Sequence, residues 1–126
     1  MLKLKDLLAA ILQTDLVIES GTSSNWTYKK YASGRLEAER VWNVGQVTIS
    51  TTVSSTWKRG GTINTPTPPM MISGSVSASL MGDSSNSAIV LEHISNTSFA
   101  IAKETSVNVT LQNVTLALRT VEARWK

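Results

Sequence analysis

The sequence predicts a mainly β protein, an antiparallel β-sandwich preceded by a short N-terminal α-helix. Apolar and polar residues alternate at period two in several short runs, the pattern of strands with one buried face. Turn residues recur about every eight to twelve positions, as they do in sandwiches. No strand–helix–strand alternation is present, which argues against a parallel sheet. Because 126 residues suit one domain, we expect an oligomerisation helix over 1–14 and a β-sandwich domain over 15–126.

The N-terminal segment has apolar residues at helical spacing along one side. These are Leu2, Leu4, Leu7, Leu8, Ile11 and Leu12. The stripe spans fewer than two heptads, so an isolated helix would be unstable and needs a partner. One interpretation is that three copies of the helix associate and make the protein a homotrimer. The other is that the helix packs against its own domain, although a β-domain of this size seldom needs such a helix for its core.

The clearest hairpin is predicted from residues 26–31 and 35–42, which flank the linker Ala32-Ser33-Gly34. The glycine of this linker can adopt the positive φ of a tight turn. One face of the hairpin is apolar, and the other carries charges that can pair across the strands. Arg40 is in phase with the apolar residues, which predicts either a bulge or a subunit boundary at this position.

Further strands are expected along the rest of the chain. The alternation predicts them at 15–19, 46–53, 70–81, 88–93 and 98–102, with breaks at 21–25 and 43–45. The Pro-containing stretch 54–69 is expected to be a long surface excursion. In the last stretch, the apolar residues of 107–111 fall on odd positions and those of 114–118 on even ones. A bulge at Gln112–Asn113 resolves this change of phase, and a second shift before Val121 is expected.

Composition argues against several classes of function. The net charge of +3 comes from scattered Lys and Arg, which is a poor pattern for nucleic-acid binding. The chain has no Cys, and no apolar run reaches the roughly 18 residues of a membrane helix. The single histidine, His93, has no neighbours at metal-ligand spacing. We therefore expect no metal, no cofactor, no nucleic-acid partner and no membrane association.

Catalytic patterns are equally weak. No Gly-x-Ser-x-Gly motif is present. Glu37 and Glu39 would lie about 7 Å apart on one strand face, within the range of an inverting glycosidase pair. They are better interpreted as exposed carboxylates beside Lys29 and Arg35. We expect that the protein is not an enzyme and has no catalytic residues.

Binding is the remaining possibility. Trp57 is expected in a loop beside Lys58 and Arg59, where its ring could stack on a sugar while the basic groups bind hydroxyls. Asp83 and Asn86, in another expected loop, could add acceptors and donors. The predicted ligand site is therefore Trp57, Arg59, Asp83 and Asn86. The alternative is that Trp57 packs over the edge of the sandwich or at a subunit interface.

A family resemblance covers the hairpin and the end of the chain. Residues 19–38 read ESGTSSNWTYKKYASGRLEA, and the last four are Ala123-Arg124-Trp125-Lys126. A Gly-Thr-Ser segment, then Asn-Trp-Thr-Tyr, a Ser-Gly turn and a Glu-Ala strand resembles minor structural proteins of tailed phages and prophages of Gram-positive bacteria. Such proteins often end on a small residue followed by Arg, Trp and Lys. This sequence departs from them at Glu39-Arg40, where an aromatic-Gly pair is common.

The resemblance implies a homotrimeric module of a phage tail tip or baseplate, made in the bacterial cytoplasm and located in the virion. Its partners would be other tail or baseplate proteins, and it would adhere to a host cell-surface saccharide. One alternative is a purely structural cap or a fibre or head decoration module without a ligand. Another is a soluble carbohydrate-binding protein resembling the H-type lectins. An exposed Trp57 beside an open groove would favour adhesion, and a Trp57 buried between subunits would favour the cap.

Overall fold

The computed structural model describes residues 15–81, 89–95 and 97–126. The predicted helix over 1–14 and two of the predicted ligand residues, Asp83 and Asn86, lie outside this part of the chain. Within it, ten strands follow one another. They are β1 Val17–Ser23, β2 Trp26–Tyr31, β3 Arg35–Ile49, β4 Thr51–Thr52, β5 Trp57–Arg59, β6 Ile63–Asn64, β7 Ser73–Leu80, β8 Ile89–Ser95, β9 Ser98–Glu104 and β10 Val109–Arg124.

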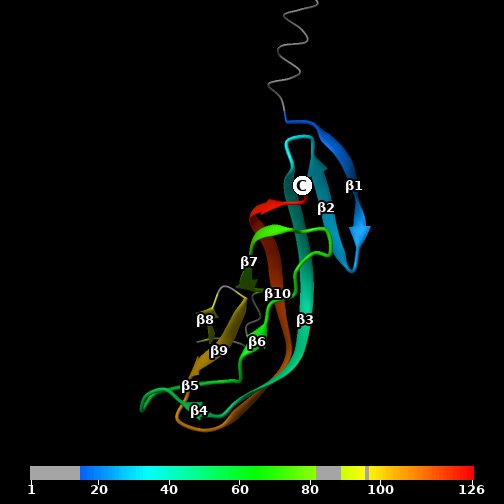
Figure 1. Cartoon of the computed structure of the whole chain (residues 1–126). Coiled ribbons are helices and arrows are strands. Elements are labelled where there is room, and N and C mark those ends of the chain that lie inside the picture. The colour runs from blue at the N-terminus through cyan, green and yellow to red at the C-terminus, as the bar shows by residue number, and fades with distance from the viewer. Residues whose placement is uncertain (1–14, 82–88, 96) are drawn as a thin grey trace, which may run out of the picture.

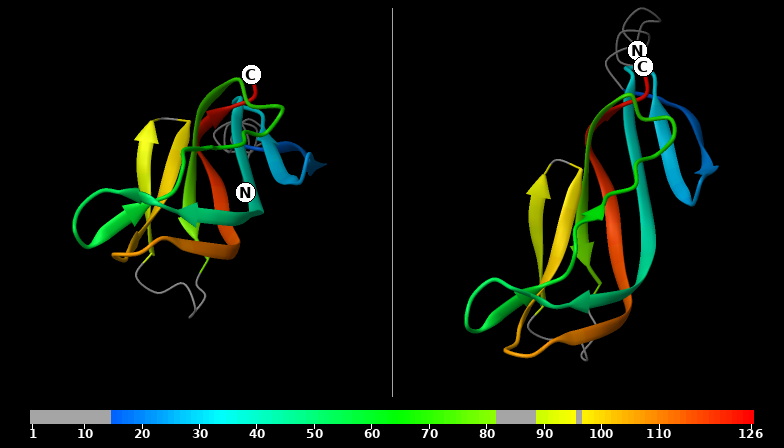
Figure 2. Two further views of the ribbon diagram at one scale, coloured as in Figure 1. Left: turned by 90° about the horizontal axis from the view of Figure 1, so that it is seen from below. Right: turned by 60° about the horizontal axis from the view of Figure 1, so that its bottom comes forward.

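The strands form two antiparallel sheets, which confirms the mainly β class predicted from the alternation. Sheet A has the order β1-β2-β3-β10-β7. In sheet B, β9 is central, with β8 on one edge and β5 and β6 at the two ends of the other edge, and β4 pairs with β5. The long strands β3 and β10 run the length of the molecule, and β8 and β9 lie beside only the part nearer β4 (Figures 1 and 2).

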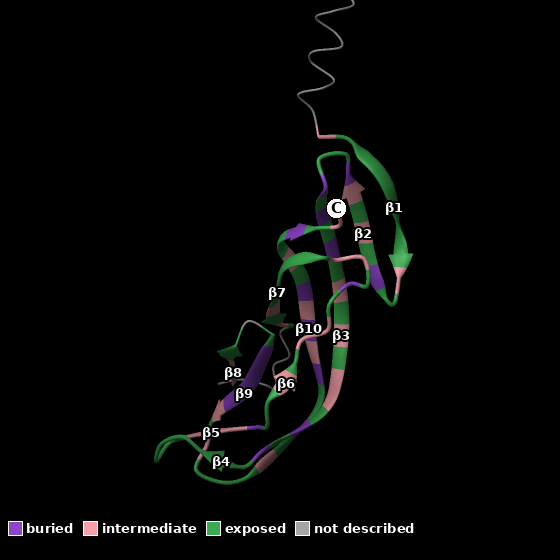
Figure 3. Cartoon of the chain, viewed as in Figure 1, coloured by how far each residue is buried: buried purple, intermediate pink, exposed green. Residues whose placement is uncertain are grey.

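The core lies between the two sheets. Sheet A contributes Trp26, Leu116 and Leu118, each at most 1% exposed, and sheet B contributes Phe99 and Ile101 from β9. In Figure 3 the buried positions alternate with exposed ones along β3 and β10, whereas β9 is buried over most of its length. Because consecutive residues of β9 are buried, both faces of this strand are covered, whereas β3 and β10 have only one face in the core.

Strand β10 confirms the change of phase expected in the last stretch of the sequence. Its register against β3 shifts between Leu111 and Val114, where Asn113 has a φ of 51°. A second shift falls between Arg119 and Ala123, where Glu122 has a φ of 50°. Leu111, Val114 and Ala123 are all buried as a result. The first bulge therefore returns Val114, Leu116 and Leu118 to the core side. The second shift was expected before Val121, and this position is wrong: the shift lies after Val121, which is 40% exposed, and it returns Ala123 to the core.

Strand β3 is longer than the sequence predicted. The break expected at 43–45 is wrong, because β3 continues through it to Ile49. Gly45 has a φ of 87°, and its N–H donates to Asn43 Oδ1 at 2.8 Å. The turn residues thus form an irregularity within a paired strand, opposite the first bulge of β10.

The Pro-containing stretch also differs from the expectation. Residues 57–59 and 63–64 are strands of sheet B, not parts of a loop. Beyond them the chain returns to sheet A, since Ile72 N–H donates to Arg124 O at 2.8 Å. Pro68 is among the fully buried side chains, and Met71 packs against the core. This stretch therefore supplies core contacts, which local Pro content alone could not indicate.

Candidate functional site

Trp57 and Arg59 lie in strand β5 of sheet B, so the expectation that Trp57 occupies a loop is wrong. Trp57 pairs with Glu104 and Arg59 with Ala102, both in β9. The Trp57 side chain is half-buried, and the Arg59 guanidinium bonds Glu92 Oε1 at 3.1 Å. Neither residue lines any of the three hollows described below. Their role in binding a saccharide stays a prediction.

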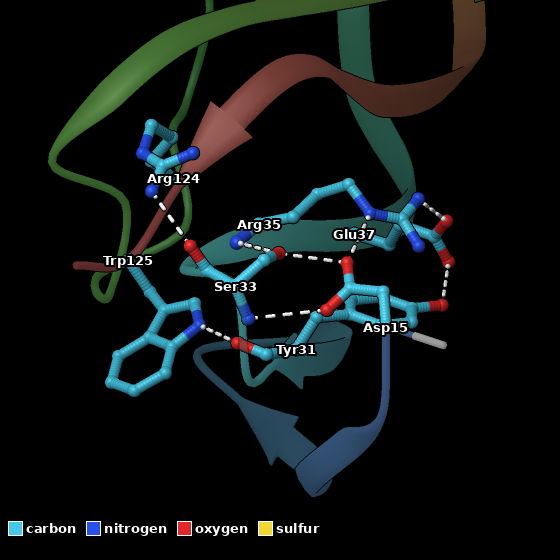
Figure 4. Close-up of polar contacts among 7 residues, drawn as sticks. All are labelled: Asp15, Tyr31, Ser33, Arg35, Glu37, Arg124 and Trp125. Carbon is cyan, nitrogen blue, oxygen red and sulfur yellow. Dashed lines mark hydrogen bonds and ion pairs between the residues drawn. The ribbon is translucent and has the colours of Figure 1, made fainter. Parts of the chain in front are cut away.

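A polar cluster fastens both ends of the described chain to the hairpin tip (Figure 4). We call it the terminal cluster. Its members are Asp15, Tyr31, Ser33, Arg35, Glu37, Arg124 and Trp125. On the N-terminal side, Asp15 accepts from the Ser33 hydroxyl at 2.7 Å, from the Ser33 N–H at 3.1 Å and from Arg35 Nε at 3.2 Å. Three donors on one carboxylate hold Asp15, the first described residue, against the hairpin tip.

On the C-terminal side, the contacts go to the backbone of the same turn. Arg124 Nη2 donates to Ser33 O at 2.8 Å, and the Trp125 indole N–H donates to Tyr31 O at 2.9 Å. The Trp125 backbone N–H donates to Gly34 O at 3.0 Å. The Lys30 ammonium lies 5.2 Å from the centre of the Trp125 ring. The last residues of the chain are thereby held beside the residues at which the described chain begins.

Arg35 connects this cluster to strand β3. Its guanidinium lies 3.8 Å from the centre of the Tyr31 ring, and its Nη1 donates to Glu37 Oε1 at 2.7 Å. The Tyr31 hydroxyl donates to Glu37 Oε2, also at 2.7 Å. Glu37 therefore accepts hydrogen bonds from both Arg35 and Tyr31.

These contacts shift the titration of the groups involved. The hydrogen bond from the Ser33 hydroxyl is the main cause that lowers the pKa of Asp15, and Arg35 contributes in the same direction. The bond to Glu37 raises the pKa of the Tyr31 phenol. The bond to Asp15 raises the pKa of Arg35. The cluster thus favours an ionised Asp15 and a protonated Tyr31.

Strand β1 is an exposed edge of sheet A. Leu16 directly before the strand and its first two residues, Val17 and Ile18, are 46%, 47% and 57% exposed. Further along, Glu19 binds the Lys30 ammonium at 2.8 Å and accepts from the Tyr28 hydroxyl at 3.1 Å, and these bonds lower the pKa of Glu19. The strand is therefore attached to β2 on one edge and presents apolar side chains to solvent.

Arg40 occupies an apolar position of β3. The register is continuous there, with Arg40 opposite Leu118, so the predicted bulge at Arg40 is wrong. The side chain is half-buried, its guanidinium lies 5.8 Å from the Trp42 ring centre, and its Nε is buried without a hydrogen-bond partner among the described residues. A buried donor without an acceptor lowers the stability of the fold. Of the two interpretations of Arg40, a bulge and a subunit boundary, the second therefore stays open, because a second subunit could supply the acceptor.

Two adjoining hollows lie on sheet A and share Thr27, Glu39 and Arg119. Thr27 is opposite Glu39, Glu39 is opposite Arg119, and Arg119 is opposite Ser77, so the four side chains form a row across β2, β3, β10 and β7. All four are exposed, whereas Ala38 and Leu118 next to them in sequence are buried. We call the face that carries this row the outer face. The hollows have volumes of about 570 and 410 Å³.

The third hollow lies between the two sheets and is smaller, about 230 Å³. Val76 of β7 and Phe99 of β9 contribute to its lining, as does His93, the single histidine of the chain. Among residues 15–81, 89–95 and 97–126, no group of His, Asp and Glu is arranged to hold a metal ion. The described part of the chain also contains no helix long and apolar enough to cross a membrane.

Comparisons with protein-family models, with curated proteins and with solved structures found no match to this chain. The arguments about function therefore rest on the residues themselves. Sequence reasoning had missed both the terminal cluster and the row on the outer face. The row has no local signal, because its members are far apart in the sequence. The terminal cluster had a signal in the sequence, because its Ser-Gly turn and its Arg124-Trp125 pair both belong to the segments that resemble phage structural proteins.

Proposed function

We propose that the protein is a non-enzymatic structural module of a phage or prophage tail tip or baseplate, and that it assembles as a homotrimer through residues 1–14. The resemblance of residues 19–38 and of the last four residues to phage structural proteins supports the location. The apolar stripe of the N-terminal segment supports the assembly, because a stripe this short needs partners to be stable as a helix.

The terminal cluster is the observation that carries this proposal. Three hydrogen bonds hold Asp15 to the hairpin tip immediately after the N-terminal segment. A module joined to its neighbours through residues 1–14 needs a stiff junction at this point, since a flexible one would leave the β-domains without a fixed orientation. The same turn also holds Arg124 and Trp125. Both resemblance segments thus meet at the proposed junction.

Two further features suit contacts between copies. The exposed apolar residues Leu16, Val17 and Ile18 follow the last residue of the N-terminal stripe, Leu12, after three polar residues. Such neighbouring apolar side chains are candidates for burial in an interface. The unpartnered Nε of Arg40 would gain an acceptor if a carboxylate or carbonyl of a second copy lay against it.

Adhesion to a host cell-surface saccharide is a second candidate function of the same module. The observation that favours it is the pair of polar hollows on the outer face. A trimer would present three such faces, and simultaneous engagement raises a weak affinity by orders of magnitude. The purely structural cap differs from this candidate in needing the trimer but no ligand.

The assembly is tested by measuring the solution mass by light scattering. We expect the full chain to have three times its 13.6 kDa mass and a chain lacking Met1–Gln13 to be monomeric. Two substitutions refine the test: L7D with I11D places charges on the apolar stripe, and Q13D places one charge off the stripe. The first variant should be monomeric, the second should remain trimeric, and both should keep the near-ultraviolet circular dichroism of the folded domain. A full chain that is monomeric would refute the proposal.

A further inference from the structure

We infer that the outer face of sheet A is a binding site for a neutral saccharide chain, with Thr27, Glu39, Arg119 and Ser77 as its contact residues. This inference deepens the adhesion part of the proposed function and rests on it, but it does not depend on the trimer. It also places the ligand on a different sheet from Trp57 and Arg59.

The shape of the site follows from strand pairing. The four contact residues lie directly opposite one another in successive strands, so their side chains share one face. Neighbouring strands are about 4.8 Å apart, which makes the row roughly 14 Å long. A row of this length can contact several consecutive units of a linear ligand that lies across the strands.

The hollow exists because small residues lie next to long ones. In the adjacent row, Val41 is opposite Ala117, and Ala117 is opposite Ser79. The short side chains of Ala117 and Ser79 form the floor of the hollow, and the longer side chains of Glu39 and Arg119 form its wall. The resulting volume of about 570 Å³ is open to solvent and is comparable to small-molecule sites, which are usually about 300–1,000 Å³.

The chemistry of the lining favours hydroxyl groups. Thr27, Ser77 and Ser79 present hydroxyls, which both donate and accept, Glu39 presents an acceptor, and Arg119 presents donors. Each hydroxyl of a saccharide likewise donates and accepts, so it can pair with any of these groups. A predominantly apolar ligand would leave the same groups desolvated and unpaired, at a cost in affinity.

The charges of the lining favour a neutral ligand. On the outer face, Lys29 and Arg119 are balanced by Glu37 and Glu39. Arg40 also lines the first hollow, but it follows Glu39 in β3, so its side chain projects to the opposite face of the sheet. Glu37 is already bound by Arg35 and the Tyr31 hydroxyl, so Glu39 is the carboxylate that a ligand would meet. An anionic polymer would be repelled by Glu39, and a cationic one by Arg119, because neither charge dominates the row.

The test uses the full chain, labelled with ¹⁵N, and four neutral probes: chitotetraose, maltotetraose, mannotetraose and cellotetraose. Amide chemical-shift changes are followed to high millimolar probe concentration. We expect saturable binding of at least one tetrasaccharide, with the largest shifts at the amides of the row. If none of the four binds, the inference is overturned.

Variants then locate the site. Ser77→Tyr should fill the hollow, and Glu39→Ala should remove the acceptor, and each should weaken binding of the same probe at least fivefold. The matched control is Thr110→Tyr, also at an exposed position but near the other end of β10, which should bind as the wild type does. Weakened binding in Trp57→Ala with unchanged binding in Ser77→Tyr would overturn the inference and return the site to sheet B.

The solution mass of each variant separates this inference from the rest of the proposed function. If Ser77→Tyr lowers the mass, the outer face is an interface between copies and the inference is overturned. If the full chain is monomeric yet binds a tetrasaccharide through the row, the trimer fails while the saccharide site stands. The two failures are therefore distinguishable.

Discussion

Replacing Gly74 by alanine should destabilise the fold much more than replacing Gly45. Both glycines have a positive φ, 109° at Gly74 and 87° at Gly45, so alanine is strained at either position. The surroundings differ. A Cβ added at Gly74 would lie 2.5 Å from Ala123 Cα and 2.8 Å from Glu122 O, whereas one at Gly45 would meet no atom within 4 Å.

The magnitudes follow from this difference. Strain of the alanine backbone at a positive φ destabilises the folded state by about 1–2 kcal/mol. Alanine also lowers the conformational entropy of the unfolded chain, which stabilises the fold by about 0.4–1 kcal/mol. The free energy of unfolding of Gly45→Ala should therefore be roughly 1 kcal/mol lower than that of the wild type. At Gly74 the clash is with backbone at the second bulge of β10, and relief requires β7 to move away from β10. Losing that close pairing should raise the cost to at least about 3 kcal/mol, in the range of severe substitutions.

The assay is equilibrium unfolding in urea, followed by tryptophan fluorescence at one protein concentration. In thermal unfolding, a loss of about 3 kcal/mol corresponds to a fall in Tm of roughly 12 °C for a domain of this size. Gly61→Ala is the control, because its Cβ would meet nothing within 4 Å and Gly61 has no positive φ. Equal destabilisation by Gly74→Ala and Gly45→Ala would refute the close approach of β7 to the bulge.

Two other predictions concern charged residues. Because the pKa of Asp15 is lowered by folding, its stabilising contribution should be fully present above its ordinary pKa of 3.8 and be lost as the pH falls through the lower folded value. As the pH is lowered below 4, the free energy of unfolding of Asp15→Asn should therefore fall less steeply than that of the wild type. Ser33→Ala should have an intermediate slope of unfolding free energy against pH. If both variants have the wild-type dependence of unfolding free energy on pH, the hydrogen bonds of the terminal cluster do not lower the pKa of Asp15. Arg40→Met should leave the unfolding free energy of the β-domain unchanged or raise it, since a buried unpaired donor is removed, but should lower the solution mass if Arg40 lies at a subunit boundary. A variant with unchanged mass at all concentrations would contradict that boundary.

The candidate site shows where sequence reasoning reached its end. A Trp beside Lys and Arg in a Pro-containing stretch predicts a binding loop at Trp57. In the structure, β9 pairs with residues 57–59 and makes them a strand, and Arg59 is bound to Glu92. That pairing depends on a strand some forty residues away, which no local pattern specifies. The contact row of the outer face was missed for the same reason.

What the sequence by itself determined is which side of the two long strands, β3 and β10, faces the core. The alternation assigned Leu116 and Leu118 to the interior, and the conflict of phase between Leu111 and Val114 required the bulge that β10 has. These follow from the period of two, a local property of the backbone. The tertiary structure decided which strands became neighbours. Thr27, Glu39, Arg119 and Ser77 form one row only because β2, β3, β10 and β7 pair in that order. Such an order depends on the closure of long loops and on packing between sheets, and not on the residues adjacent in the chain.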